Sequence, residues 1–177
     1  AEGYARDCAR LADALAEGTI VQQDLARAAT LWGQACDKGI VLACGQVATA
    51  LQGGRGVSRD VASARRRHQQ ACDANVVANC RALAHLVREG EGAPKDAALA
   101  ATLYRKACDG GVAGACGDLG ELTRTGDGVK ADPKAAAELL ARGCDAGPAE
   151  ARFCVPLGAL LVHEARFDSL ARPAAQA

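Results

Sequence analysis

The chain has 177 residues, half of them apolar but only 3% aromatic, so a core must be built from alanine, leucine and valine. Small helix-forming residues favour an all-α protein, and β-branched residues are too sparse for a large sheet. Lysine plus arginine equals aspartate plus glutamate at 21 each, which excludes an overall charge that attracts nucleic acid or anionic lipid. No apolar run approaches the roughly 18 residues of a membrane-spanning helix.

Nine cysteines give the chain its most regular feature. A first series recurs every 36 residues at Cys36, Cys72, Cys108 and Cys144. A second series keeps this period and ends in one displaced member: Cys8, Cys44, Cys80, Cys116 and Cys154. A fixed period of this length indicates a structural repeat. Eight cysteines form four local pairs: Cys36/Cys44, Cys72/Cys80, Cys108/Cys116 and Cys144/Cys154.

The period divides the chain into successive units. Residues 1–23 hold only the second helix of a partial repeat, and full repeats follow at 24–59, 60–95 and 96–131. Residues 132–163 form an atypical capping repeat with Pro156 inside its second helix, and residues 164–177 form a tail. Units open on aspartates suited to helix N-caps: Asp24, Asp60, Asp96 and Asp132. They close on glycines suited to helix C-caps: Gly18, Gly54, Gly90 and Gly126.

Each full unit contains two helical patterns. In the first, Ala28, Leu31, Trp32 and Ala35 have the spacing of one helix face. In the second, apolar residues such as Val47 recur at matching places. Helix pairs of this kind cannot bury their apolar faces alone, so we expect an all-α solenoid of stacked αα-hairpins.

The repeat resembles the Sel1-like repeat proteins, which are related to the tetratricopeptide repeats, and within them the disulfide-stapled Helicobacter cysteine-rich proteins. The resemblance rests on the Ala-x-x-Leu-Trp/Tyr-x-x-Ala-Cys-Asp-x-Gly helix end, the seven-residue gap to the second cysteine, and the Gly-x-Gly-Val loops at Gly54 and Gly126. It covers nearly the whole chain. It implies a right-handed superhelix of 36-residue units with one disulfide per unit.

Three roles are open to the cysteine pairs: disulfides, free structural thiols, and metal or haem ligands. A pair that straddles a helix–helix turn can clamp two helices, which stabilises the fold by roughly 2.5 kcal/mol per bridge in the chain-entropy model. Zinc sites favour closer ligands, and pairs one repeat apart do not converge. No Cys-x-x-Cys-His haem motif occurs. Disulfides without metal or cofactor are favoured, and they predict an oxidising compartment.

Cys8 belongs to no pair. Its register places a partner eight residues earlier, before Ala1, so we expect the chain to begin inside a repeat. The alternative is a free Cys8 at a mature N-terminus.

The sequence offers little for catalysis. Its three serines, Ser58, Ser63 and Ser169, begin no Ser-x-x-Lys motif and lie in no Gly-x-Ser-x-Gly elbow. The glycine-rich loops recur once per repeat, as turns do, and lack the lysine of a phosphate-binding loop. We therefore expect a protein that is not an enzyme.

The densest run of positive charge, Arg65 to His68, lies in the repeat at 60–95. Arg67 and His68 stand where the preceding repeat has Leu31 and Trp32, so two polar residues replace apolar packing. They are expected to face a local cavity or an acidic partner, or to extend their polar ends out of the stack.

Solenoids bind partners along a concave surface, which the analogy with tetratricopeptide repeats assigns to the first helices. Arg65 and Gln69 then face the groove together with Arg105, and arginine matches carboxylates geometrically. The alternative is that these are ordinary solvated helix residues. The predicted partner-binding residues are Arg65, Arg67, His68, Gln69 and Arg105.

These features predict a non-enzymatic interaction scaffold or adaptor of the bacterial cell envelope, periplasmic or secreted. The expected partner is a protein or peptide with acidic groups, not nucleic acid, and no membrane span is expected. The excess of arginine over lysine and the many alanines indicate a GC-rich bacterial genome. The alternative function is binding or hydrolysis of cell-wall fragments or β-lactams.

Overall fold

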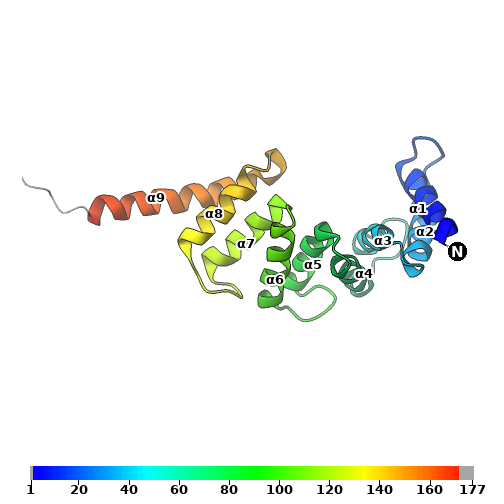
Figure 1. The fold of residues 1–177 in the computed structure, drawn as a ribbon, viewed down its shortest axis with the longest axis horizontal. Helices are drawn as coiled ribbons and strands as arrows, with labels where there is room; N and C mark the ends of the chain where they lie inside the picture. Colours follow the sequence, from blue (N-terminus) through cyan, green and yellow to red (C-terminus); the bar gives the residue numbers. More distant parts are fainter. Residues whose placement is uncertain (1, 172–177) are drawn as a thin grey trace, which may run out of the picture. The chain divides into compact units, whose positions relative to one another are not determined.

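The computed structural model describes the backbone of residues 2–171 and the side chains of residues 3–162. All regular structure in these residues is helical, and the chain divides into two compact units, Ala1–Asp96 and Ala97–Ala177. The predicted all-α fold of packed helix hairpins is confirmed within each unit (Figure 1).

The first unit contains five α-helices, and each packs against the next in the chain. They are α1 (Glu2–Glu17), α2 (Leu25–Asp37), α3 (Val41–Gly53), α4 (Val61–Asp73) and α5 (Val77–Glu89). The helix predicted for the partial first repeat is α1.

The second unit begins with three α-helices: α6 (Ala97–Asp109), α7 (Ala113–Thr125) and α8 (Pro133–Cys144). The enlarged turn after α8 is a 3-10 helix, η1 (Pro148–Phe153), which leads directly into α9 (Cys154–Ala171). Pro156 lies in the first turn of α9, where a missing backbone N–H costs no helical hydrogen bond. α9 runs continuously across residue 163, where the sequence analysis ended the capping repeat.

The expected helix caps form at the repeat boundaries. The carboxylates of Asp24, Asp60 and Asp132 accept hydrogen bonds of 2.9 to 3.0 Å from backbone N–H groups three residues further on. The hydrogen bonds from Ser63 hold the pKa of Asp60 below its ordinary value. Left-handed glycines end α3, α5 and α7, at Gly54, Gly90 and Gly126. The length of each helix is therefore set by residues that recur with the repeat.

Alanine dominates the core, as the composition predicts. Ala28, Ala35, Ala64 and Ala107 are fully buried, and their small side chains let helix backbones approach closely. Few large side chains join them, and Tyr104 is the bulkiest that is completely buried among the described residues. A core of this kind buries little apolar surface per residue, so covalent bridges add substantially to its stability.

Four disulfides clamp the hairpins, which resolves the three roles considered for the cysteines. The bridges join α2 to α3, α4 to α5, α6 to α7 and α8 to α9, with Cα atoms 4.7 to 4.9 Å apart. They are Cys36–Cys44, Cys72–Cys80, Cys108–Cys116 and Cys144–Cys154. Cys8 is buried in α1 and is a free cysteine.

Candidate partner-binding site

A cavity of about 550 Å³ lies in the first unit on one face of α1, α3 and α5. Each helix supplies the residue two places after its second-series cysteine: Arg10, Gln46 and Ala82. These three positions are one repeat apart, so they follow one another from helix to helix along the same face. Trp32 and His68 reach the cavity from α2 and α4.

The α1 side of the cavity carries positive charge. Arg6 and Arg10 lie one turn apart on α1, so both guanidinium groups are on one helix face. Arg10 is exposed and forms no ion pair with any residue that the structure describes. Asp13, the one acidic residue of this cavity, accepts a hydrogen bond of 2.8 Å from Trp32 Nε1. The lining of this end therefore favours an anionic group.

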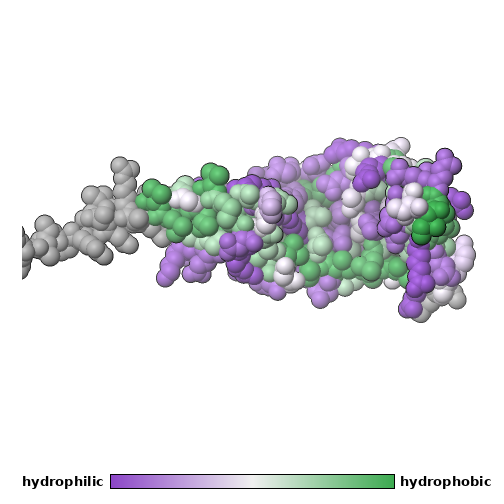
Figure 2. All heavy atoms as spheres, turned by 90° about the horizontal axis from the view of Figure 1, so that it is seen from above, coloured by the Kyte–Doolittle hydropathy of each residue, from purple (hydrophilic) through white to green (hydrophobic). Residues whose placement is uncertain are grey.

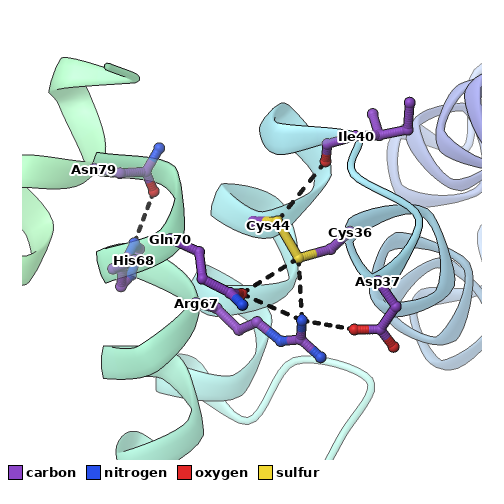
Figure 3. The surroundings of a disulfide bond; sticks show 8 residues. All are labelled: Cys36, Asp37, Ile40, Cys44, Arg67, His68, Gln70 and Asn79. Carbon is purple, nitrogen blue, oxygen red and sulfur yellow. Dashed lines mark hydrogen bonds and ion pairs between the residues drawn. A yellow bond between two sulfur atoms is a disulfide. The ribbon is translucent and has the colours of Figure 1, made fainter. Parts of the chain in front are cut away.

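A polar pair, His68 and Asn79, lies on the opposite side of the cavity. The Nδ1 atom of His68 lies 2.7 Å from Oδ1 of Asn79, which is an acceptor, so Nδ1 carries the hydrogen (Figure 3). His68 is only 2% exposed, and its burial lowers the pKa of the imidazole more than the hydrogen bond to Asn79 raises it. The imidazole is therefore neutral at pH 7, and its Nε2 is a buried acceptor without a hydrogen-bond partner.

The contact with His68 also orients the amide of Asn79. Because Oδ1 is engaged with His68, the Nδ2 group is the donor that remains available. Asn79 fits because it lies over Gly45, where a Cβ atom would come within 2.6 Å of Nδ2. The cavity thus contains a fixed hydrogen-bond donor on the α5 side and arginine side chains on the α1 side.

The family model for the Sel1 repeat matches four segments of the chain: residues 5–40, 41–76, 80–112 and 113–148. The chain belongs to the Sel1 repeat family. Each Sel1 repeat opens on a helix that carries a second-series cysteine, α1, α3, α5 or α7, and closes on the next helix. The units defined by the cysteine spacing have the same period but begin at the other helix of each pair, α2, α4, α6 or α8. In the family register, the first three disulfides join one Sel1 repeat to the segment that follows it.

Solved structures with this fold include three bacterial proteins. A Sel1 repeat protein from Oxalobacter formigenes is 24% identical, with a TM-score of 0.76 over 83% of this chain and 60% of that protein. A protective antigen of uropathogenic Escherichia coli is 25% identical, with a TM-score of 0.82 over 90% and 34%. Cysteine-rich protein B of Helicobacter pylori is 26% identical, with a TM-score of 0.55 over 74% and 94%. No curated protein matches at a significant level.

The chain therefore spans 60% and 34% of the first two Sel1 repeat proteins. The match to the Helicobacter protein supports the resemblance to disulfide-stapled cysteine-rich proteins. No described helix is long and apolar enough to cross a membrane. The described residues also contain no group of three His, Cys, Asp or Glu side chains arranged to hold a metal ion.

The predicted partner-binding residues do not gather at the cavity. His68 lines it, whereas Arg67 turns back to α2 and forms an ion pair of 2.7 Å with Asp37 (Figure 3). In this structure the guanidinium of Arg67 is thus engaged with a carboxylate of its own chain. Gln69 donates a hydrogen bond of 2.7 Å to Asp73, in the next turn of α4.

The two remaining predicted residues differ in burial. Arg65 is half-buried, and its Nη1 atom has no hydrogen-bond partner. Arg105 is exposed on α6, in the second unit. Neither lines the cavity of the first unit.

Sequence reasoning missed Arg10, Gln46 and Asn79. Each lies next to a second-series cysteine or two places after it, at positions where residue type changes from repeat to repeat. That variability is the signal in the sequence, but the analogy with tetratricopeptide repeats predicts a groove on the other helix of each hairpin.

In the second unit, the residue two places after the second-series cysteine of α7 is bonded to another residue of the same chain. Asp118, two places after Cys116, is 3% exposed and accepts a hydrogen bond of 2.9 Å from Arg152. The guanidinium carbon of Arg152 lies 4.5 Å from the ring centre of Phe153, which packs over Gly117. The 3-10 helix thereby covers α7 at Gly117 and Asp118, so the chain itself occupies the place that is open in the first unit.

A separate apolar surface lies on α9. Val155, Leu161 and Val162 are each more than half exposed, and Figure 2 shows apolar side chains gathered on the described part of this helix, beside the residues drawn in grey.

Proposed function

We propose that this Sel1 repeat protein is a non-enzymatic scaffold that binds a partner protein outside the bacterial cytoplasm. The cavity on α1, α3 and α5 carries the proposal. Its lining differs from repeat to repeat, whereas the residues that pack and cap the helices recur. Repeat solenoids commonly bind along such a continuous helix face.

The chemistry of the lining favours an extended, acidic segment of the partner. Arg10 is placed to pair with a carboxylate, because guanidinium groups bind carboxylates through two parallel hydrogen bonds, and Arg6 adds positive charge on the same helix face. The Nδ2 group of Asn79 is a donor suited to a main-chain carbonyl oxygen. Leu42, which is 70% exposed, offers apolar contact between these two polar ends.

The position of the cavity modifies the site predicted from the sequence. That prediction used α4 and α6, the helices that close each Sel1 repeat, whereas this proposal uses the helices that open them and keeps His68 as the common residue. Arg65, Gln69 and Arg105 then contact the partner only if it extends beyond the cavity.

The proposed compartment follows from the cysteines. Four disulfides require an oxidising environment, which in bacteria is the periplasm or the cell exterior. The matched Escherichia coli protein is described as a protective antigen, which suits an exported protein.

A peptide-display selection against the oxidised chain tests the binding function. We expect enrichment of acidic sequences whose affinity falls at least tenfold in Ala82→Glu, because the new carboxylate enters the cavity and repels them. Ala62→Glu is the matched control, since it makes the same change at an exposed position on α4 outside the cavity.

A thermal-shift screen with muropeptides and β-lactams tests the alternative function. A saturable shift with one of these compounds, together with an empty peptide selection, would overturn the proposal. So would binding of the selected peptides that both glutamate variants leave unchanged.

A further inference from the structure

The Cys36–Cys44 disulfide has a cation in contact with one of its sulfur atoms. Nη1 of Arg67 lies 3.2 Å from Sγ of Cys36 (Figure 3). A disulfide sulfur carries no hydrogen, so the guanidinium donates and the sulfur accepts. The same Nη1 atom lies 2.7 Å from the carboxylate of Asp37 and 3.3 Å from Oε1 of Gln70. The side chain is thus held against the bridge by two oxygen atoms.

The second unit supplies a matched bridge without this contact. Cys108–Cys116 has the same sequence separation and the same Cα–Cα distance as Cys36–Cys44. Leu139 stands in the register position of Arg67, and Arg142 donates to the carbonyl oxygen of Cys108 at 3.2 Å. The two bridges therefore share their sequence separation and Cα–Cα distance, and they differ in whether an arginine contacts the sulfur itself or a backbone oxygen.

Thiol–disulfide exchange is sensitive to such a charge. An attacking thiolate expels one cysteine sulfur as a thiolate, and a more stable leaving thiolate departs faster. A neighbouring arginine stabilises a thiolate by direct charge attraction. The contact with Arg67 therefore favours cleavage in which Cys36 is the leaving group and Cys44 is attacked.

We propose that Arg67 makes Cys36–Cys44 a reduction-sensitive bridge whose opening controls the cavity. A dithiol reductant attacks Sγ of Cys44, the S–S bond breaks, and its electron pair remains on Cys36 as a thiolate beside Arg67. The second thiol of the reductant then displaces Cys44. The reductant leaves as a cyclic disulfide, and Cys44 takes up a proton.

The link to the cavity follows from the closed loop. Ile40, Leu42 and Ala43 lie between the bridged cysteines, and all three line the cavity. Opening the bridge releases the covalent restraint on this turn, so the wall formed by the start of α3 gains freedom. This second step rests on the proposed function, whereas the ease of reduction does not.

Reduction of the folded, oxidised chain by dithiothreitol tests the first step without any partner. Samples are quenched with iodoacetamide over time, and the labelling of each cysteine pair is followed by peptide mass spectrometry. We expect Arg67→Gln to slow the reduction of Cys36–Cys44 by roughly three- to tenfold, and Asp37→Asn to accelerate it by releasing Arg67 from its carboxylate. Cys108–Cys116 in the same molecule is the internal control.

The opposite effects of the two variants on the reduction rate distinguish an electrostatic effect from loosened packing. If the Arg67 contact were only structural, both variants would expose the bridge and both would accelerate its reduction. That result, or an unchanged rate in Arg67→Gln, would overturn the proposal. Circular dichroism before reduction verifies that each variant is folded.

The effect on the cavity is measured with a selected peptide after partial reduction. We expect affinity to fall in proportion to labelling at Cys36 and Cys44. Unchanged affinity would refute the control of the cavity while leaving the rate effect of Arg67 intact. An empty peptide selection would count against the proposed function alone.

Discussion

Nδ1 of His68 donates a hydrogen bond of 2.7 Å to Oδ1 of Asn79. The preceding repeat of this chain has side chains of different size at these two positions. The equivalent residues are Trp32 and Ala43 one repeat earlier. Trp32 is larger than His68, whereas Ala43 is smaller than Asn79, so the two differences in size oppose each other. The two positions are therefore coupled by packing as well as by the hydrogen bond.

This coupling predicts a non-additive pair of mutations. His68→Trp overpacks the site while Asn79 is present, and Asn79→Ala leaves the buried Nδ1–H group without its acceptor, so each should cost about 1 to 3 kcal/mol in the free energy of unfolding. The double variant restores the combination of Trp32 and Ala43, and should lie within about 1 kcal/mol of the wild type. Urea denaturation of the wild type, the two single variants and the double variant measures their free energies of unfolding. If the two single losses simply add up in the double variant, the positions are not coupled.

Burial of His68 predicts a pH-dependent stability. Its pKa is lowered in the folded state, so the unfolded chain binds the proton more readily once the pH falls below the ordinary value near 6.5. The contribution of His68 is complete above that pH and is lost as the pH falls toward the folded-state pKa. Denaturation between about pH 7.5 and 5.5 should show this slope in the wild type, and His68→Gln should flatten it. Equal slopes in both proteins would assign the effect to other groups.

Close contact between Gly117 and Phe153 predicts a size-dependent defect in the second unit. A Cβ atom at Gly117 would overlap the phenyl ring, so Gly117→Ala should destabilise the fold by about 2 kcal/mol. In the Phe153→Ala background the same change should cost much less, because the ring is gone. Thermal unfolding of the wild type, both single variants and the double variant measures these costs. If Gly117→Ala is equally destabilising with and without Phe153, the phenyl ring is not the group that it overlaps.

The four bridges predict a defined change in mass. Each disulfide removes two hydrogens, so the intact oxidised chain should weigh about eight mass units less than the reduced chain. Reduction should also lower the unfolding temperature markedly, since each bridge contributes roughly 2.5 kcal/mol. Identical masses before and after reduction would remove both the bridges and the inference about the compartment.

Most of the fold was predictable because its determinants are local. Cysteine spacing, aspartate caps such as Asp24 and glycine caps such as Gly54 act within one or two turns, so a repeated sequence reports them directly. The apolar stripe at Ala28 and Trp32 likewise marks the buried face of α2, as the structure confirms.

The site was harder to predict because it depends on contacts between repeats. Nothing near Arg67 in sequence indicates that its side chain reaches back to Asp37 and Cys36, in the preceding repeat. His68 was singled out correctly as a departure from the apolar stripe, but its partner Asn79 lies on the next helix. The space for Asn79 depends on Gly45, which lies on α3 and not on a neighbouring turn of α5, and only the packed structure reveals that dependence.

The short span of each disulfide also bears on how the chain reaches its oxidised state. Eight cysteines can pair in about 105 ways, and a secreted protein with distant partners needs extensive reshuffling to find the right one. Here each correct partner is eight or ten residues away, while the next cysteine along the chain is several times farther. Because loop closure becomes less probable as the loop lengthens, the native pairs are also the ones that a disordered chain forms first. Each hairpin can thus be oxidised as soon as it enters an oxidising compartment, with little demand for a disulfide isomerase.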